Sequence, residues 1–335
     1  MRIGIFDHLD DSGRPLPEHY EERLRLAERY DAAGFHAYHL AEHHATPLGT
    51  APSPNVFLAA LAQRTKRLRF GPMVYCLPLY HPLRLYEEIC MLDQMSRGRL
   101  EFGVGRGISP IELSFFGIES DASRAIYAEA LELIRRALAG GRLSFAGTYY
   151  RVDDMPLELE PVQRPHPPLW YGVADPASAE RAADEGMNVI TNRPLAEVRG
   201  LTEAYRARWL ALKRDPAALP NLGVSRHLVL GEDAEEALTI ARRAYRRWRA
   251  GFLKLWDEHG MAPINVKLPP EIDQMIEAGL AVVGTPEHAA EVLGAQIEAS
   301  GINYLAARFA FGDLGFDQAA RSIDLFVERV WPRLP

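Results

Sequence analysis

The chain has 335 residues, of which 47% are hydrophobic and 25% are charged, an ordinary composition for a globular protein. Its net charge of −7 argues against nucleic acid as the main partner, because neutralising phosphates requires an excess of Lys and Arg. No apolar run approaches the roughly 20 residues that span a bilayer, and the two cysteines, Cys76 and Cys90, form no CxxC pair. We therefore expect a cytoplasmic protein with no membrane partner, disulfide framework or structural zinc.

Strands and helices alternate along the chain, which is typical of parallel βαβ units. Strands are predicted at residues 2–6, 37–41, 68–76, 100–104, 169–173, 188–191, 222–230 and 304–309. Helices are predicted at residues 17–33, 54–65, 82–95, 122–138, 176–185, 196–213, 234–248, 286–300 and 316–330. This order of strand–helix pairs predicts one domain over residues 1–335, a (β/α)8 TIM barrel of the α/β class.

Two stretches break the alternation and are interpreted as insertions. Residues 142–167 are rich in proline, and residues 144–152 within them predict a short hairpin around Ala146-Gly147 over the barrel surface. Residues 249–281 mix Gly and Pro with large apolar side chains, so they are too long for a plain connector and too apolar for disorder. This second stretch has two interpretations: a mobile flap near a site, or a segment packed on the surface of the barrel.

The stretch from residue 91 to residue 107 carries the first candidate site. Gly98 suits a helix C-cap, and the alternating residues 100–104 predict a strand with two unlike faces. Gly105-Arg106-Gly107 follows, where the glycines allow close approach and the arginine offers a planar fork suited to phosphate. The C-terminal end of a strand is where an α/β barrel keeps its site. A tight turn with a solvated arginine explains the same residues.

Two further stretches could bind an anion. Arg124 opens the helix predicted at 122–138 and could form a phosphate clamp with Arg106. Asp175 and Ser178 begin the helix predicted at 176–185, where free backbone N–H groups favour an anion. Solvation of Arg124 and plain capping by Asp175 are the alternatives. The chain has no GxxxxGK[ST] loop and no dinucleotide GxGxxG, and its GxSxG-type candidates fail.

Glu42-His43-His44 follows the second predicted strand and supplies the candidate acid–base groups. A neutral histidine can act as a general base near pH 7, and Glu42 could orient it. Adjacent histidines on a strand point to opposite sides, and there is no HExxH, so a metal site is weakly supported. A hydrogen-bonded structural histidine is the competing interpretation.

Together these stretches resemble the bacterial luciferase-like flavin monooxygenase family. The similarity is densest in residues 41–44, 55–71, 77–107 and 122–125, and it returns in residues 173–186 and 282–293. The resemblance implies an α/β barrel that uses reduced FMN as a co-substrate, supplied by a separate flavin reductase. It implies that a flavin hydroperoxide formed with dioxygen oxygenates a small organic substrate, and that the protein is a homodimer.

The same resemblance assigns roles to individual residues. His43 corresponds to the family's catalytic histidine, with Glu42 and His44 beside it. The residues implied to bind the flavin phosphate or to lie beside the flavin ring are Arg106, Arg124, Asp175, Ser178, Met73 and Val74. The peptide bond between the last two is cis and non-proline in several members. Luciferase itself has a cysteine where this chain has Gly105, so the resemblance does not imply light emission.

Two other functions are compatible with these residues. A deazaflavin-dependent oxidoreductase of the same superfamily transfers hydride and needs no oxygen, so oxygen consumption separates it from a monooxygenase. A non-catalytic flavin-binding subunit is the third candidate. Such subunits tend to lose the histidine and the phosphate arginines, whereas this chain keeps His43, Arg106 and Arg124.

Overall fold

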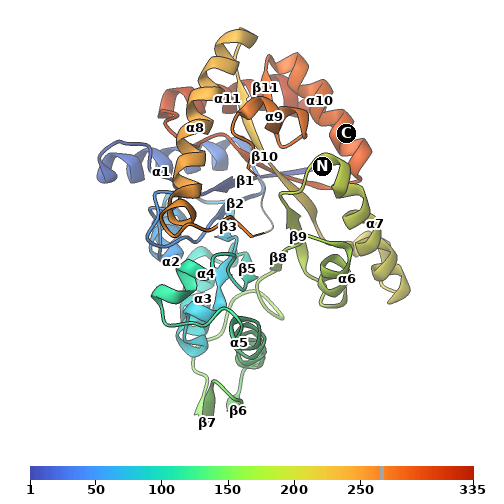
Figure 1. Cartoon of the computed structure of the whole chain (residues 1–335). Coiled ribbons are helices and arrows are strands. Elements are labelled where there is room, and N and C mark those ends of the chain that lie inside the picture. Colours follow the sequence, from blue (N-terminus) through green and yellow to red (C-terminus); the bar gives the residue numbers. More distant parts are fainter. Residues whose placement is uncertain (265–267) are drawn as a thin grey trace.

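A computed structural model describes residues 1–264 and 268–335 and shows a nearly closed barrel of parallel strands with helices around it (Figure 1). The barrel strands are β1 (Arg2–Asp7), β2 (Ala37–Leu40), β3 (Arg69–Pro72), β4 (Tyr75–Cys76), β5 (Phe102–Gly105), β8 (Leu169–Gly172), β9 (Asn188–Thr191), β10 (Leu222–Leu230) and β12 (Tyr304–Arg308). Their order is β3-β2-β1-β12-β10-β9-β8-β5-β4. Because β3 and β4 are two pieces of one predicted strand, this order returns to its start and confirms the (β/α)8 barrel.

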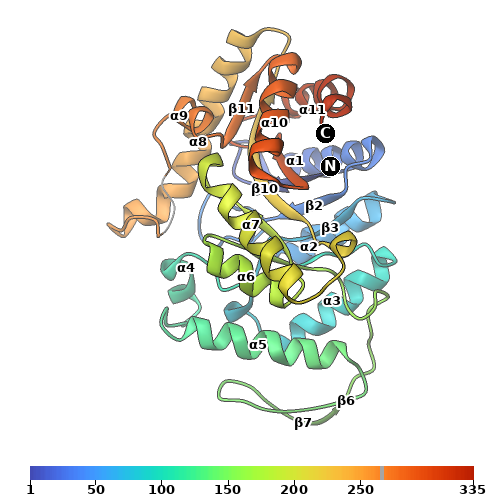
Figure 2. The ribbon, with the colours of Figure 1, turned by 90° about the vertical axis from the view of Figure 1, so that its right-hand side faces the viewer.

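The helices alternate with the strands and cover the outside of the barrel (Figures 1 and 2). They are α1 (Leu16–Ala33), α2 (Pro54–Arg64), α3 (Pro82–Ser96), α4 (Pro110–Phe115), α5 (Ser123–Leu138), α6 (Pro176–Asp184), α7 (Leu195–Ala211), α8 (Ala234–Glu258), α9 (Ile272–Glu277), α10 (Pro286–Ser300) and α11 (Phe316–Leu325). Among the described residues, no helix has the length and apolar character needed to cross a membrane.

The predicted strand at 100–104 has two unlike faces, as expected, but both are buried. Leu100, Phe102 and Val104 belong to the core cluster, whereas Glu101 accepts from the Trp170 indole inside the barrel. Glu101 and Gly103 are buried along with their neighbours, because a barrel strand faces the interior on one side and helices on the other. A Cβ on Gly103 would lie 2.1 Å from the carbonyl oxygen of Pro72, so glycine is needed where these strands approach. The helix cap differs from the prediction: Arg97 is the left-handed C-cap of α3, and Gly98 follows it with positive φ.

Other differences concern connections between the predicted elements. The predicted strand 68–76 is interrupted, and the Met73–Val74 peptide bond at the interruption is cis, as the resemblance implied. The short helix α4 was not predicted. Neither was strand β11 (Ala281–Gly284), which pairs in parallel with the last four residues of β10.

The two predicted insertions have different outcomes. Residues 142–167 contain the antiparallel hairpin β6 (Arg142–Ala146) and β7 (Arg151–Pro156), which projects from the lower part of the molecule (Figure 2). The prediction that 249–281 is irregular is wrong for much of its length. Helix α8 continues to Glu258, and α9 and β11 fill the end of the stretch. Residues 265–267 of this predicted flap lie outside the described residues.

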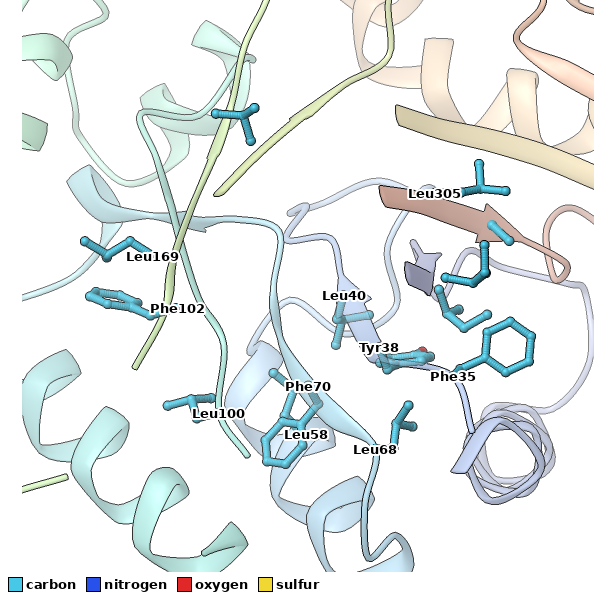
Figure 3. Close-up of a cluster of buried hydrophobic side chains, with 14 of the residues drawn as sticks. Phe35, Tyr38, Leu40, Leu58, Leu68, Phe70, Leu100, Phe102, Leu169 and Leu305 are labelled. Carbon is cyan, nitrogen blue, oxygen red and sulfur yellow. The ribbon is translucent and has the colours of Figure 1, made fainter. Parts of the chain in front are cut away.

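Most of the apolar core lies between the strands and the surrounding helices (Figure 3). A second cluster fills the inside of the barrel with Phe6, Ala41, Met73, Trp170, Ile190, Tyr304 and Ala306. Two polar contacts lie among these side chains: His39 Nε2 lies 2.8 Å from the Tyr304 hydroxyl, and the Trp170 indole donates to Glu101. The interior is therefore a packed core, and a ligand must bind at one end of the barrel.

A buried acid near the start of the chain predicts how stability depends on pH. Asp10 follows β1, its Oδ2 accepts the Gly312 N–H at 2.6 Å, and Arg23 lies 3.7 Å from its Oδ1. Burial raises the pKa of Asp10 to about 7. The folded state therefore holds a proton that the unfolded state releases near pH 4, so this contribution to stability is present below about pH 4 and is lost as pH rises to about 7.

We expect Asp10→Asn to remove that pH dependence, which amounts to roughly 4 kcal/mol at most over this range. The measurement is the free energy of unfolding in urea at several pH values between 5 and 8. Asp11→Asn, at the partly exposed neighbouring position, is the matched control. Equal pH slopes in the parent and in Asp10→Asn would contradict the assignment.

Candidate functional site

The candidate residues gather at the C-terminal end of the barrel. His43 follows β2, the cis Met73–Val74 bond lies between β3 and β4, Arg106 follows β5, and Asp175 comes shortly after β8. Parallel strands all end at the same mouth, so residues far apart in sequence are brought to one rim. A surface hollow of about 460 Å³ lies around Met1, Asn221 and Asn303 near the starts of the strands, away from these groups.

His43 is oriented by a residue that was not predicted. Its Nδ1 lies 3.2 Å from Glu112 Oε1 on α4, and the other oxygen of Glu112 accepts the His44 backbone N–H at 2.8 Å. Burial by itself would raise the pKa of Glu112, but these hydrogen bonds hold it below its usual value. The carboxylate thus favours the tautomer with hydrogen on Nδ1, which leaves Nε2 as the proton-accepting atom of His43.

The expectation that Glu42 orients His43 is wrong in this structure. Glu42 is buried and accepts from the Cys76 backbone N–H at 3.0 Å and the Tyr80 hydroxyl at 2.9 Å, and its other oxygen lies 2.9 Å from His44 Nε2. It therefore ties the end of β2 to β4 and positions His44. The two histidines lie beyond the end of β2, and their side chains contact different carboxylates. The described part of the chain contains no group of three or more His, Cys, Asp or Glu placed to hold a metal.

Arg106 and Arg124 lie at the N-terminus of α5. Arg106 Nη1 is 3.3 Å from Ser123 Oγ, a weak contact, and Arg124 is exposed with no hydrogen bond or ion pair to any described residue. Most of their N–H donors are therefore free, which fits a phosphate dianion. Gly105 adjoins the cis bond, since a Cβ there would lie 2.3 Å from a methyl group of Val74.

Asp175 and Ser178 form a capping box at the start of α6. Asp175 Oδ1 accepts the Ser178 N–H at 2.7 Å, and Ser178 Oγ accepts the Asp175 N–H at 3.1 Å. The Ser178 N–H lowers the pKa of Asp175, which keeps the carboxylate charged. A phosphate placed here would face that negative charge. The geometry supports capping, and a direct role in phosphate binding stays a prediction.

Sequence reasoning missed a second polar group at the mouth, formed by His8, His227, Trp248 and Arg308. The His8 ring lies 5.6 Å from that of His43 and 5.7 Å from that of Trp248. Burial, followed by the charge of Arg308, lowers the pKa of His8 and of His227 well below the usual value. The sequence could have indicated Arg308 as a candidate, because it lies at the C-terminal end of the last barrel strand. Arg106 was chosen for the same kind of position, directly after the fourth predicted strand.

Comparisons with known proteins agree on one family. The family model described as luciferase-like monooxygenase matches residues 1–304. The chain is 46% identical to protein y4wF of Sinorhizobium fredii over 95% of this chain and 92% of that protein. It is 29% identical to limonene 1,2-monooxygenase of Rhodococcus erythropolis over 88% of this chain and 76% of that enzyme.

Solved structures share the fold over the whole chain. The monooxygenase RslO1 of Streptomyces bottropensis is 30% identical, with a TM-score of 0.89 over 99% of both chains. Two less similar structures share the fold alone. The oxygenating constituent of 3,6-diketocamphane monooxygenase from Pseudomonas putida, in complex with FMN, is 20% identical with a TM-score of 0.80 over 100% of this chain and 99% of that one. An F420-dependent secondary alcohol dehydrogenase is 19% identical with a TM-score of 0.74 over the same shares.

Proposed function

The chain belongs to the luciferase-like monooxygenase family, whose members are flavin-dependent oxidoreductases, and on this basis we propose that it oxygenates a small organic substrate with reduced FMN and dioxygen. A separate reductase would supply the reduced FMN. One observation carries the proposal. Two arginines with free donors and a histidine hydrogen-bonded to a carboxylate lie at the same barrel mouth. In the sequence, the histidine precedes the cis Met73–Val74 bond and the arginines follow it.

The phosphate of the flavin would be held by Arg106 and Arg124. A dianion gains strongly from charge-assisted hydrogen bonds, and the neighbouring N-terminus of α5 adds a favourable dipole. The reduced flavin, when bound, supplies the electrons that activate dioxygen. The packed barrel interior below the mouth, with Phe6 and Trp170, would exclude water from beneath the flavin ring.

His43 would move a proton to or from the reacting substrate. Glu112 fixes the ring through Nδ1, so Nε2 is the atom that exchanges the proton. Glu42 and His44 would support this site by holding its backbone in place. Their side chains contact each other, and Glu42 also accepts the Cys76 backbone N–H of β4.

The protein is also proposed to act as a homodimer. Val56 on α2 and Met91 and Met95 on α3 are large apolar side chains exposed to solvent. The two helices are neighbours on one side of the barrel (Figure 1), so these side chains can contribute to one apolar face. Sedimentation of the purified protein as a monomer would contradict this part of the proposal.

The purified protein should bind FMN and should consume dioxygen when a flavin reductase supplies reduced FMN. The measurement is fluorescence titration with FMN and with F420, followed by oxygen uptake with and without the protein at equal reductase activity. Hydride transfer with F420 is the second candidate, since an F420-dependent enzyme shares this fold. Tight F420 binding with no response to FMN would replace the proposed function by that candidate. FMN binding with no effect on oxygen uptake would indicate a non-catalytic subunit.

A further inference from the structure

Arg308 is held rigidly at the end of β12, with 5% of its surface exposed. Its Nε donates to Ser225 Oγ at 2.8 Å, and its Nη2 donates to Asn192 Oδ1 at 3.4 Å. The guanidinium carbon lies 4.4 Å from the centre of the Phe6 ring and 5.7 Å from that of Trp248. Side chains from β1, β10, α8 and the end of β9 therefore surround a planar cation at the barrel mouth.

Arg308 forms no ion pair with any described residue, although the charges of Asp10 and Asp7 raise its pKa against the larger effect of burial. The nearby carboxylates Asp7 and Asp10 lie within 3.5 and 3.7 Å of Arg23, which lies on α1. Asp7 also accepts the Leu9 N–H and the Tyr38 hydroxyl, so it is fully engaged. The acceptors that Arg308 does reach are a hydroxyl and an amide, and its Nη1 has no hydrogen-bond partner in the described chain.

Such an arrangement is costly unless a ligand completes it. Burial lowers the pKa of Arg308 to about 9, so the group stays charged near pH 7. Its neighbours His8 and His227 are kept neutral and offer no compensating charge. A buried cation without a partner destabilises a protein, whereas an anion bound at this point would pair with it. By contrast, the half-buried Arg69 is paired with the buried Glu101.

Arg308 lies on the other side of the barrel mouth from the residues proposed to bind the flavin phosphate. In the barrel order, β8, β9 and β10 lie between β5, which Arg106 follows, and β12. Arg308 is therefore across the mouth from Arg106. It is on the side of His43, because the His8 ring contacts both the His43 ring and the Trp248 ring that Arg308 overlies. A group bound by Arg308 is thus near the proposed acid–base residue.

We propose that Arg308 binds a carboxylate of the organic substrate, so that the enzyme takes an acidic substrate. The inference rests on the proposed function, because it assumes that the flavin occupies the Arg106 side of the mouth. A guanidinium fork matches the planar geometry of a carboxylate and binds it more strongly than an amide of the same shape. Phe6 and Trp248 flank the cation and provide apolar contact for the carbon skeleton that carries the acid.

The test compares aromatic monocarboxylates with their amides on the purified full chain. Benzoate and phenylacetate are titrated against benzamide and phenylacetamide at constant ionic strength, followed by tryptophan fluorescence and by the melting temperature. We expect the acids to bind at least tenfold more tightly than the amides. Arg308→Met should abolish that preference without lowering the melting temperature of the unliganded protein, because it removes an unpaired buried charge.

Arg226→Met is the matched control. Arg226 is also buried without a carboxylate, but it faces α10, where its Nε lies 3.3 Å from Gln296 Oε1. This variant should keep the preference for acids, and Arg308→Met should keep the FMN affinity of the parent. Equal binding of acids and amides by the parent, or equal loss in both variants, overturns the proposal. Weaker FMN binding in Arg308→Met would instead assign the arginine to the flavin. Failure of the parent to bind FMN, with the preference for acids intact, would refute the proposed function alone.

Discussion

Replacing His43 with alanine should lower the product formed per reduced flavin by about 10²–10⁴-fold while FMN affinity stays nearly unchanged. General acid–base catalysis typically contributes this much, and the loss falls on turnover because the side chain of His43 contacts Glu112 and not the arginines proposed to bind the phosphate. Dioxygen would still react with the reduced flavin, so hydrogen peroxide should replace product. The measurement is the yield of product and of peroxide per reduced flavin consumed.

Two variants separate a catalytic role of His43 from a structural one. Glu112→Gln keeps a hydrogen-bond acceptor for Nδ1 but removes the negative charge, so it should give an intermediate loss of product and an altered pH profile. His288→Ala changes an exposed histidine on α10 and should leave the yield unchanged. A His43→Ala variant with parental product yield would show that the histidine is structural.

Removing both Arg106 and Arg124 should weaken FMN binding by about 100-fold. In the proposed complex each arginine would make a charge-assisted contact worth roughly 1.5–3 kcal/mol, which is about tenfold or more in affinity, and two groups on one phosphate need not add fully. The single variants Arg106→Ala and Arg124→Ala should each lose about tenfold. Fluorescence titration with FMN gives the affinities.

Riboflavin makes this test specific, because it has the same ring system without the phosphate. The parent should prefer FMN to riboflavin, and the double variant should bind the two about equally. Arg151→Ala, which changes an exposed arginine on the hairpin strand β7, should behave as the parent. If the double variant retains the preference for FMN, the phosphate lies elsewhere on the mouth, and the N-terminus of α6 with Asp175 and Ser178 is the next position to test.

Several features of this protein follow from its sequence alone. The alternation of strand and helix patterns predicts the barrel, because each strand–helix unit is built from contacts between residues close in sequence. The candidate residues follow predicted strands directly, and parallel strands end at one rim. That these residues meet at the mouth therefore follows from the barrel topology, which the sequence predicts. Element boundaries in α2, α3 and β10 agree with prediction because proline and hydrophobic periodicity mark them locally.

Only the tertiary structure decided how those residues are paired. Glu112 reaches His43 across 69 positions because α4 folds back over the end of β2, and no local pattern indicates that return. Strand β11 forms because β10 extends beyond the barrel and offers a free edge, which a short apolar segment far along the chain then pairs with. That Arg308 forms no ion pair with a described residue is likewise invisible in the sequence. Whether a buried arginine has a counter-ion depends on where the carboxylates of other strands and helices lie, and here Asp7 and Asp10 lie against Arg23 on α1.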